Sequence, residues 1–143
     1  MGKRLSVFAA AGLMLIGSLA ARAQEAPKPR PGGWVLPPTA AEEKNPFAGD
    51  AKAIAAGKEL YDKTCKKCHG PGGKGDGPDA DPDAMEDMNL TVARRAARNP
   101  DGIVFYKIWN GRAKPKMPAQ KDELTRDQVW QIVSYAQTLR SKP

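Results

Sequence analysis

Nitrogen and sulfur ligands for metals are scarce in this chain of 143 residues, which has only two cysteines, Cys65 and Cys68, and one histidine, His69. A structural zinc site needs about four ligands, and these three residues supply too few. A redox disulfide of the thioredoxin kind belongs near a βαβ pattern, which the sequence lacks, and a bridge across so short a loop would be strained. Zinc binding and a disulfide are therefore secondary interpretations of these residues.

Aromatic residues are also few, at 6% of the chain, whereas 14 glycines and 13 prolines are a high proportion. The length is that of one small domain. Such a composition leaves little large apolar material to fill a core. A bulky apolar prosthetic group bound to the chain would relieve that shortage.

The N-terminal apolar run, residues 5–20, is shorter than the ~20 residues that a membrane-spanning helix needs. Two basic residues precede it, and the triplet Ala-Arg-Ala at 21–23 follows it, which is the pattern of a cleaved signal peptide. This N-terminal segment has no Arg-Arg pair, so the general secretory route is favoured over the twin-arginine route. We expect residues 1–23 to be removed, with an uncleaved membrane anchor as the alternative.

Removal of this segment takes away three basic residues and no acidic one. The formal net charge then falls from +7 by three, to +4. No cysteine follows directly after the cleavage point, which argues against a lipid anchor.

Residues 24–50 are expected to form a proline-rich leader ahead of a domain at 51–143. Six prolines lie between Gln24 and Phe47, and this density argues for extended polyproline segments rather than regular structure. Trp34 and its two apolar neighbours are the exception. Such a triplet is expected to pack, either on the domain or on a partner.

The sequence Cys65-Lys66-Lys67-Cys68-His69 is typical of a c-type haem attachment site. Two cysteines three residues apart on a helix point to one side, about one turn apart. They can therefore form thioethers with two vinyl groups on one edge of a porphyrin. The imidazole of His69 can then take one axial position on the iron.

The motif lies at the end of a helix predicted over residues 50–68, with Asp50 as its N-cap. Gly57 and Tyr61 fall on the same face as the cysteines. A glycine inside a helix costs about 1 kcal/mol relative to alanine. Gly57 therefore predicts the close approach of another backbone at this point.

Residues 70–87 are rich in glycine and then in acidic residues, which indicates a solvated loop. A short helix is predicted over 91–98. Asn99 as cap and Pro100 at the first position then begin another helix that ends at Asn110.

The last helix is predicted over 124–140. Thr125 serves as its cap, and Gln128 completes a capping box.

Met117 lies in a polar loop, residues 111–121, between Pro115 and Pro118, which stiffen it. Methionine is normally a flexible filler of apolar gaps, so this position is unusual. With no second histidine in the chain, its thioether is the natural candidate for a second axial ligand.

Taken in this order, these features resemble a class I monohaem cytochrome c over about residues 51–139. The matching elements are Gly57-x-x-x-Tyr61, Cys65-Lys-Lys-Cys-His-Gly70, Gly75-Asp-Gly-Pro78, Gly111 ahead of Met117-Pro118, and Ile132 with Tyr135. The stretch from 80 to 98 matches only loosely.

The resemblance implies an all-α cytochrome c fold, with about four to five helices around one covalent haem c. It implies thioethers at Cys65 and Cys68, and His69 and Met117 as axial ligands of the iron. The carbonyl of Pro78 would accept the imidazole N–H of His69, which fixes the ring.

The resemblance also implies that the first and last helices cross. Gly57 and Tyr61 would there meet Ile132 and Tyr135, which places Tyr61 at the haem site.

The function that follows from this resemblance is single-electron transfer between redox proteins in the periplasm, without catalysis. Nucleic acid is a poor partner for an exported chain of modest charge. Acidic redox proteins suit the bases expected to rim the haem edge. These bases are Lys66, Lys67, Arg112, Lys114, Lys116 and Lys121.

Two alternatives to a free carrier remain open. A small haem enzyme, peroxidase-like or gas-binding, would need an open or labile sixth position on the iron. A cytochrome subunit serving one exported dehydrogenase is favoured by the leader with Trp34.

Overall fold

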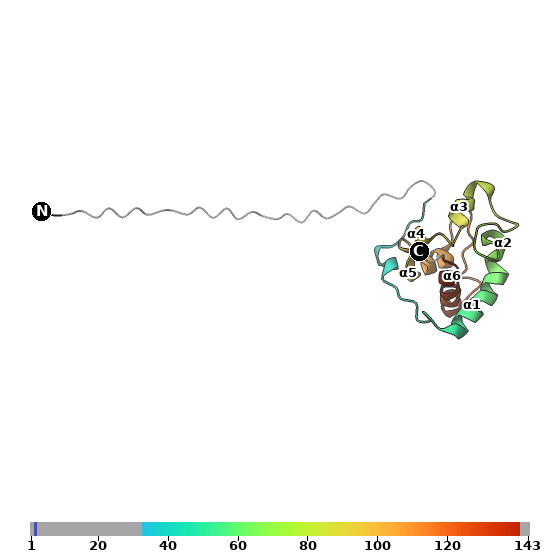
Figure 1. Ribbon diagram of the computed structural model, residues 1–143, viewed down its shortest axis with the longest axis horizontal. Helices are drawn as coiled ribbons and strands as arrows, with labels where there is room; N and C mark the ends of the chain where they lie inside the picture. Colours follow the sequence, from blue (N-terminus) through green and yellow to red (C-terminus); the bar gives the residue numbers. More distant parts are fainter. Residues whose placement is uncertain (1, 3–32, 141–143) are drawn as a thin grey trace.

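The computed structural model describes Gly2 and residues 33–140. Within them the chain forms six α-helices and no β-strand, so the predicted all-α fold is confirmed (Figure 1). The helices are α1 (Ala51–Thr64), α2 (Lys66–His69), α3 (Met85–Met88), α4 (Ala93–Ala96), α5 (Asp101–Asn110) and α6 (Arg126–Thr138), with 3-10 turns η1 (Pro38–Ala41) and η2 (Pro82–Ala84). None of the helices in this part of the chain is long and apolar enough to cross a membrane.

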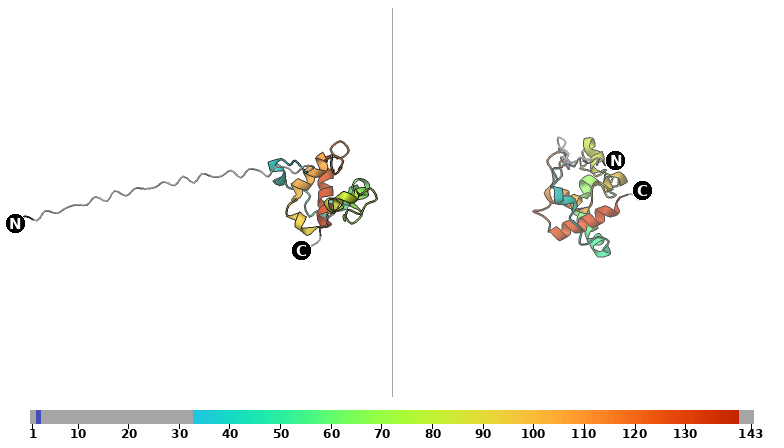
Figure 2. Two further views of the ribbon diagram at one scale, coloured as in Figure 1. Left: turned by 90° about the horizontal axis from the view of Figure 1, so that it is seen from above. Right: turned by 90° about the vertical axis from the view of Figure 1, so that its left-hand side faces the viewer.

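Helix α6 packs against α1 on one side and against α5 on the other (Figures 1 and 2). The predicted close approach at Gly57 is confirmed, because a Cβ built there would lie 1.9 Å from the carbonyl oxygen of Gln131 in α6. One turn further along α1, the ring of Tyr61 meets the ring of Tyr135 edge-on, with centroids 5.1 Å apart. The first and last helices therefore cross as the resemblance implied.

Helix α1 begins at the predicted cap, where the carboxylate of Asp50 accepts hydrogen bonds from the backbone N–H groups of Lys52 and Ala53. The single helix predicted over 50–68 is wrong at its far end. The helix breaks at Cys65 (φ −110°, ψ −34°), and α2 begins at the next residue. The break falls within the attachment motif itself.

The main core lies between α5 and α6, where Phe105 stacks on Trp130 with ring centroids 4.1 Å apart. Helix α6 has the predicted capping box. The hydroxyl oxygen of Thr125 accepts from the N–H of Gln128, whose side-chain oxygen accepts from the N–H of Thr125. This cap fixes where the helix starts and so which of its faces meets α1 and α5.

The predicted start of α5 is wrong by one residue, because its N-cap is Pro100 and no side chain caps it. The side chain of Asn99 is engaged elsewhere: its amide donates to the carbonyl of Arg95, and its oxygen accepts from the amine of Lys107. The stretch 70–87, expected to be a loop throughout, contains the short elements η2 and α3.

The leader packs on the domain over the part that the structure describes. Contrary to the prediction of no regular structure before Phe47, the chain forms η1. The buried amide of Asn45 donates to the hydroxyl of Ser134 in α6 at 2.9 Å. Gly102 in α5 lets the carbonyl oxygen of Ala40 approach so closely that a Cβ at position 102 would lie 2.1 Å from it. The folded unit therefore extends beyond Ala51 toward the N-terminus.

The predicted signal peptide, residues 1–23, lies outside the described residues apart from Gly2, and so does the leader as far as residue 32.

Substitution of Gly57 tests the helix crossing. In Gly57→Ala the added methyl group collides with the backbone of α6, which cannot rotate away as a side chain could. We expect the free energy of unfolding to fall by about 3 kcal/mol, the upper end of the usual cost of overpacking. Urea denaturation measures this through the midpoint at constant slope.

Gly72→Ala is the matched control, because a Cβ at Gly72 meets nothing within 4 Å. Its midpoint should equal that of the unsubstituted protein. Equal midpoints for both variants would contradict the close helix contact.

Candidate functional site

A cavity of about 270 Å³ brings the predicted site residues together, although they come from distant parts of the chain. Cys65, Cys68 and His69 lie on its wall with Tyr61, and Met117 joins them from the loop that follows α5. The apolar part of the wall includes Leu90, Val104, Ile108, Pro118, Ile132 and Ala136. Of the predicted residues with a role at the cofactor, only Pro78 is not part of the wall.

The two cysteines are half-buried and carry free thiols, so the disulfide considered from the sequence is not formed. Burial raises the pKa of the Cys65 thiol, and a contact with the Thr64 hydroxyl at 3.2 Å opposes this in part. Cys65 is therefore a neutral thiol at pH 7. Within the described residues, no group of three or more histidines, cysteines and acidic residues could hold a metal ion.

His69 is held by the chain that follows η2. Its Nδ1 lies 2.7 Å from the carbonyl oxygen of Met88, the last residue of α3. A carbonyl can only accept, so Nδ1 carries the proton and the lone pair is on Nε2. Burial lowers the pKa of His69, while the bond to Met88 acts in the opposite direction. The neutral ring is thus oriented as a metal-binding histidine requires.

The expectation that the carbonyl of Pro78 accepts the N–H of His69 is wrong. The turn around Pro78 is pinned to the backbone of α2, because the N–H groups of Gly77 and Asp79 donate to the carbonyls of Cys68 and Lys67. Pro78 is exposed there, and the short helix α3, which sequence reasoning missed, supplies the acceptor instead.

One sequence signal could have found the turn after α3. The side-chain oxygen of Asn89 accepts from both the N–H and the hydroxyl of Thr91, an Asx-type turn directly after Met88. The N–H of Leu90 also donates to the carbonyl of Gly73 at 2.7 Å. These bonds fix the chain on both sides of the peptide that holds His69.

Tyr61 is almost fully buried, and its hydroxyl donates to the carbonyl of Gly70 at 2.7 Å. Burial is the main cause that raises the pKa of this hydroxyl, so it stays a neutral donor. Its ring lines the cavity, while its hydroxyl anchors the residue directly after His69. Tyr61 thus lies at the site as expected, and its hydroxyl also holds the C-terminal end of α2.

The loop that carries Met117 is held by more than its prolines. The backbone N–H groups of Arg112 and Met117 each donate to the other residue's carbonyl, at 2.8 and 2.9 Å. Gly111, with φ +62°, permits this closure, since a Cβ there would lie 2.4 Å from the carbonyl oxygen of Met117. Met117 is half-buried and packs on the core cluster of α5 and α6.

Five cationic side chains line the same cavity, with Asp87 as the acidic residue among them: Arg95, Lys107, Arg112, Lys116 and Arg140. Burial, and then the charge of Arg112, lowers the pKa of Lys107 to about 8. This wall would therefore be stabilised by an anion. Sequence reasoning did not single out Arg95, Lys107 or Arg140, because charges at these spacings look like an ordinary solvated surface.

Arg112 does not belong to the exposed rim where the sequence placed it. Its side chain is only 16% exposed, and its Nη2 lies 3.3 Å from a carboxylate oxygen of Asp87. Its Nε donates to the carbonyl of Pro115, and its guanidinium lies 4.9 Å from the ring centroid of Trp34. The remaining five bases of the rim, Lys66, Lys67, Lys114, Lys116 and Lys121, are exposed.

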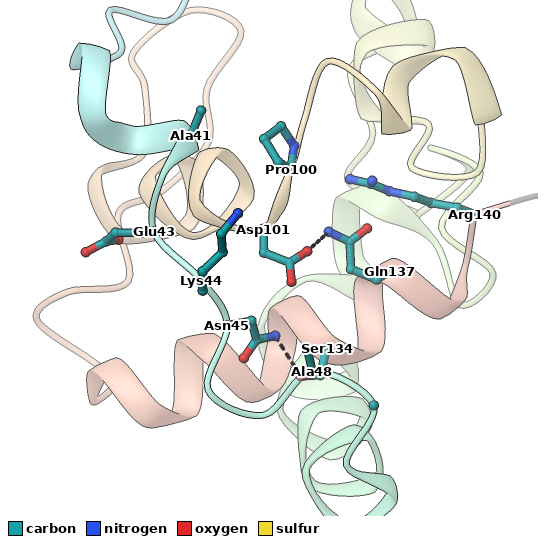
Figure 3. Close-up of a pocket in the computed structure, with 11 residues that line it drawn as sticks. Ala41, Glu43, Lys44, Asn45, Ala48, Pro100, Asp101, Ser134, Gln137 and Arg140 are labelled. Carbon is teal, nitrogen blue, oxygen red and sulfur yellow. Dashed lines mark hydrogen bonds between the residues drawn. The ribbon is translucent and has the colours of Figure 1, made fainter.

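A second hollow, of about 450 Å³, lies between the leader and the helices α5 and α6 (Figure 3). Its hydrogen-bonded pairs are Asn45 with Ser134 and Asp101 with Gln137. No cysteine, histidine or methionine lines it. The chemistry of the motif is thus confined to the first cavity.

The wall of the first cavity fits the groups of a c-type haem. Two thiols match two vinyl groups, and a neutral imidazole and a thioether are both ligands of haem iron. Apolar side chains suit the ring, and the cationic residues suit its two carboxylates. A model of the cytochrome c family matches residues 54–140, more than half of the chain. The chain therefore belongs to the cytochrome c family, whose members bind haem c covalently and generally carry electrons.

Proposed function

We propose that this protein is an exported class I cytochrome c that carries single electrons between redox proteins. The observation that carries the proposal is that His69 and Met117 line one cavity together with both thiols. An iron held by an imidazole and a thioether has no position left for a substrate. Electron transfer is then favoured over the enzymatic alternative.

In this proposal Cys65 and Cys68 would hold the cofactor, and His69 Nε2 and the sulfur of Met117 would bind its iron. When bound, haem supplies an iron that changes between its ferrous and ferric states. The carbonyl of Met88 keeps the proton on Nδ1 of His69, which raises the basicity of the other nitrogen. Methionine ligation and the apolar wall favour the ferrous state and raise the reduction potential.

The bond between iron and a thioether is weak, so the ligand must be held in place before it binds. The paired backbone hydrogen bonds of Arg112 and Met117 meet this need. The N–H groups of Gln120 and Lys121 also donate to carbonyls at the end of α5, those of Ile108 and Trp109. The loop is thereby tied to the core on both sides of the ligand.

Replacement of the methionines tests the ligand assignment. We expect Met117→Ala to lose the far-red charge-transfer band of the ferric protein and to lower the reduction potential. Met85→Ala is the control, because Met85 is exposed. Met88→Ala is the stricter comparison, since Met88 lies on the cavity wall but acts on His69 through its backbone, which alanine retains.

Both of these variants should keep the band and nearly the same potential. A Met117→Ala protein that keeps the band would refute the assignment, and with it the main argument against an enzyme.

We also propose that partners dock electrostatically at the exposed bases of the rim. Lys66 and Lys67 lie within the attachment motif, and Lys114 and Lys116 flank Pro115 in the methionine loop. Charges of one sign beside the cofactor speed the encounter with an oppositely charged partner. Screening by salt acts over about 8–10 Å at ordinary ionic strength.

Oxidation by small complexes of opposite charge tests this docking surface. The ferrous protein should react more slowly with an anionic oxidant such as ferricyanide as salt rises, and faster with a cationic cobalt complex. Lys114→Glu/Lys116→Glu should flatten both trends. Lys52→Glu is the control, because Lys52 lies about 20 Å along α1 from Cys65 at 1.5 Å per residue.

Rates with ferricyanide that do not change with salt would argue against the docking surface. An effect of Lys52→Glu half as large as that of Lys114→Glu/Lys116→Glu would show that only net charge matters, because the single variant changes the net charge by two and the double variant by four.

A further inference from the structure

Trp34, in the leader outside the family-matched residues 54–140, lines the same cavity as Cys65, Cys68, His69 and Met117. It is half-buried, whereas the next residue, Val35, is 71% exposed. The apolar triplet of the leader therefore does not pack as a unit. Its tryptophan alone turns toward the cavity.

The indole of Trp34 is held by two cations of the cavity wall. The guanidinium of Arg112 lies 4.9 Å from the ring centroid, and the amine of Lys107 lies 5.4 Å from it. Both distances are within the range of cation–π attraction, which is worth up to about 2 kcal/mol when the cation is desolvated. Both cations are largely buried here, so the contact is of the stronger kind.

The leader reaches this position along a fixed path. Behind Trp34 the chain is anchored at Ala40, whose carbonyl lies against Gly102, and at Asn45, which is bonded to Ser134 and to the carbonyl of Trp130. An exposed ion pair joins Glu43 to Arg126 at 3.0 Å. The described leader is thus held to the domain near both of its ends, by Trp34 and by Asn45.

We propose that Trp34 is a haem-contacting residue, which covers the cationic side of the cavity together with Lys107 and Arg112 and keeps water from that edge of the cofactor. This proposal rests on the proposed function, because it concerns the same cavity. Two consequences follow. The described part of the leader, residues 33–50, belongs to the cofactor site, and Trp34 serves the domain instead of a dehydrogenase partner.

Water exclusion at this edge has a measurable consequence. The ferric site carries one more positive charge than the ferrous site, so water stabilises it more strongly. Removal of the indole admits water and should lower the reduction potential. The axial ligands should be unaffected, because the Trp34 ring is held by Lys107 and Arg112, whereas His69 is held by the carbonyl of Met88.

The test is redox titration of the haem-loaded protein with three variants. Trp34→Ala should lower the potential and keep the far-red band. Trp34→Phe should restore most of the loss, because phenylalanine also presents an aromatic face to the two cations. Val35→Ala, at the exposed neighbouring position, should have the potential of the unsubstituted protein.

A double-mutant cycle with Lys107→Met distinguishes a shared cover from two separate effects. If Trp34 and Lys107 act as one unit, the shift in reduction potential of the double variant should be smaller than the sum of the shifts of the two single variants. Additive shifts would overturn the joint role. A Trp34→Ala protein with an unchanged potential would overturn the whole inference, even if its stability fell.

These outcomes are separable from failure of the proposed function. Absence of the far-red band in the unsubstituted protein would reject the carrier assignment directly. Loss of the far-red band in Trp34→Ala alone would instead reject the water-excluding role of Trp34, because Trp34 would then act on the axial ligand.

Discussion

The contact between α1 and α6 at Gly57 is the constraint on which the cavity depends. The backbone of Gln131 occupies the place where any side chain at position 57 would begin. This approach lets Tyr61 reach Tyr135, and it brings the end of α1, and the two thiols that follow it, beside the buried face of α6. A wider separation would move the attachment motif away from Ile132 and the apolar wall.

Electrostatics explains why the cavity suits one kind of cofactor. Five cations and a single carboxylate line this cavity, and the lowered pKa of Lys107 reflects the cost of burying charge there. An apolar ring that carries two carboxylates relieves both the unfilled volume and the uncompensated charge. Arg112 links the parts, since it contacts Asp87 in α3, pairs with Met117 through its backbone and holds Trp34.

Local signals predicted much of this structure. Asp50 and Thr125 cap their helices as expected because a cap involves only neighbouring residues. Gly57 predicted a helix contact because a glycine there is otherwise unfavourable. The hydrogen-bond acceptor of His69 was missed because it lies 19 residues further along the chain, and its position depends on how the intervening loop folds. Arg112 was wrongly placed on the exposed rim because the sequence does not show which charged side chains turn inward. The place of Trp34 on the cavity wall depends on how the leader packs on the domain, which the sequence does not show either.

A crystal structure of the oxidised, haem-loaded protein tests the central claim most directly, which is that this cavity presents His69 and Met117 to one iron. The account predicts iron bonded to Nε2 of His69 and to the sulfur of Met117, with the carbonyl of Met88 still accepting from Nδ1. It also predicts thioethers at Cys65 and Cys68. An iron bonded to the sulfur of Met88, or a His69 ring bonded to the carbonyl of Pro78, would contradict it.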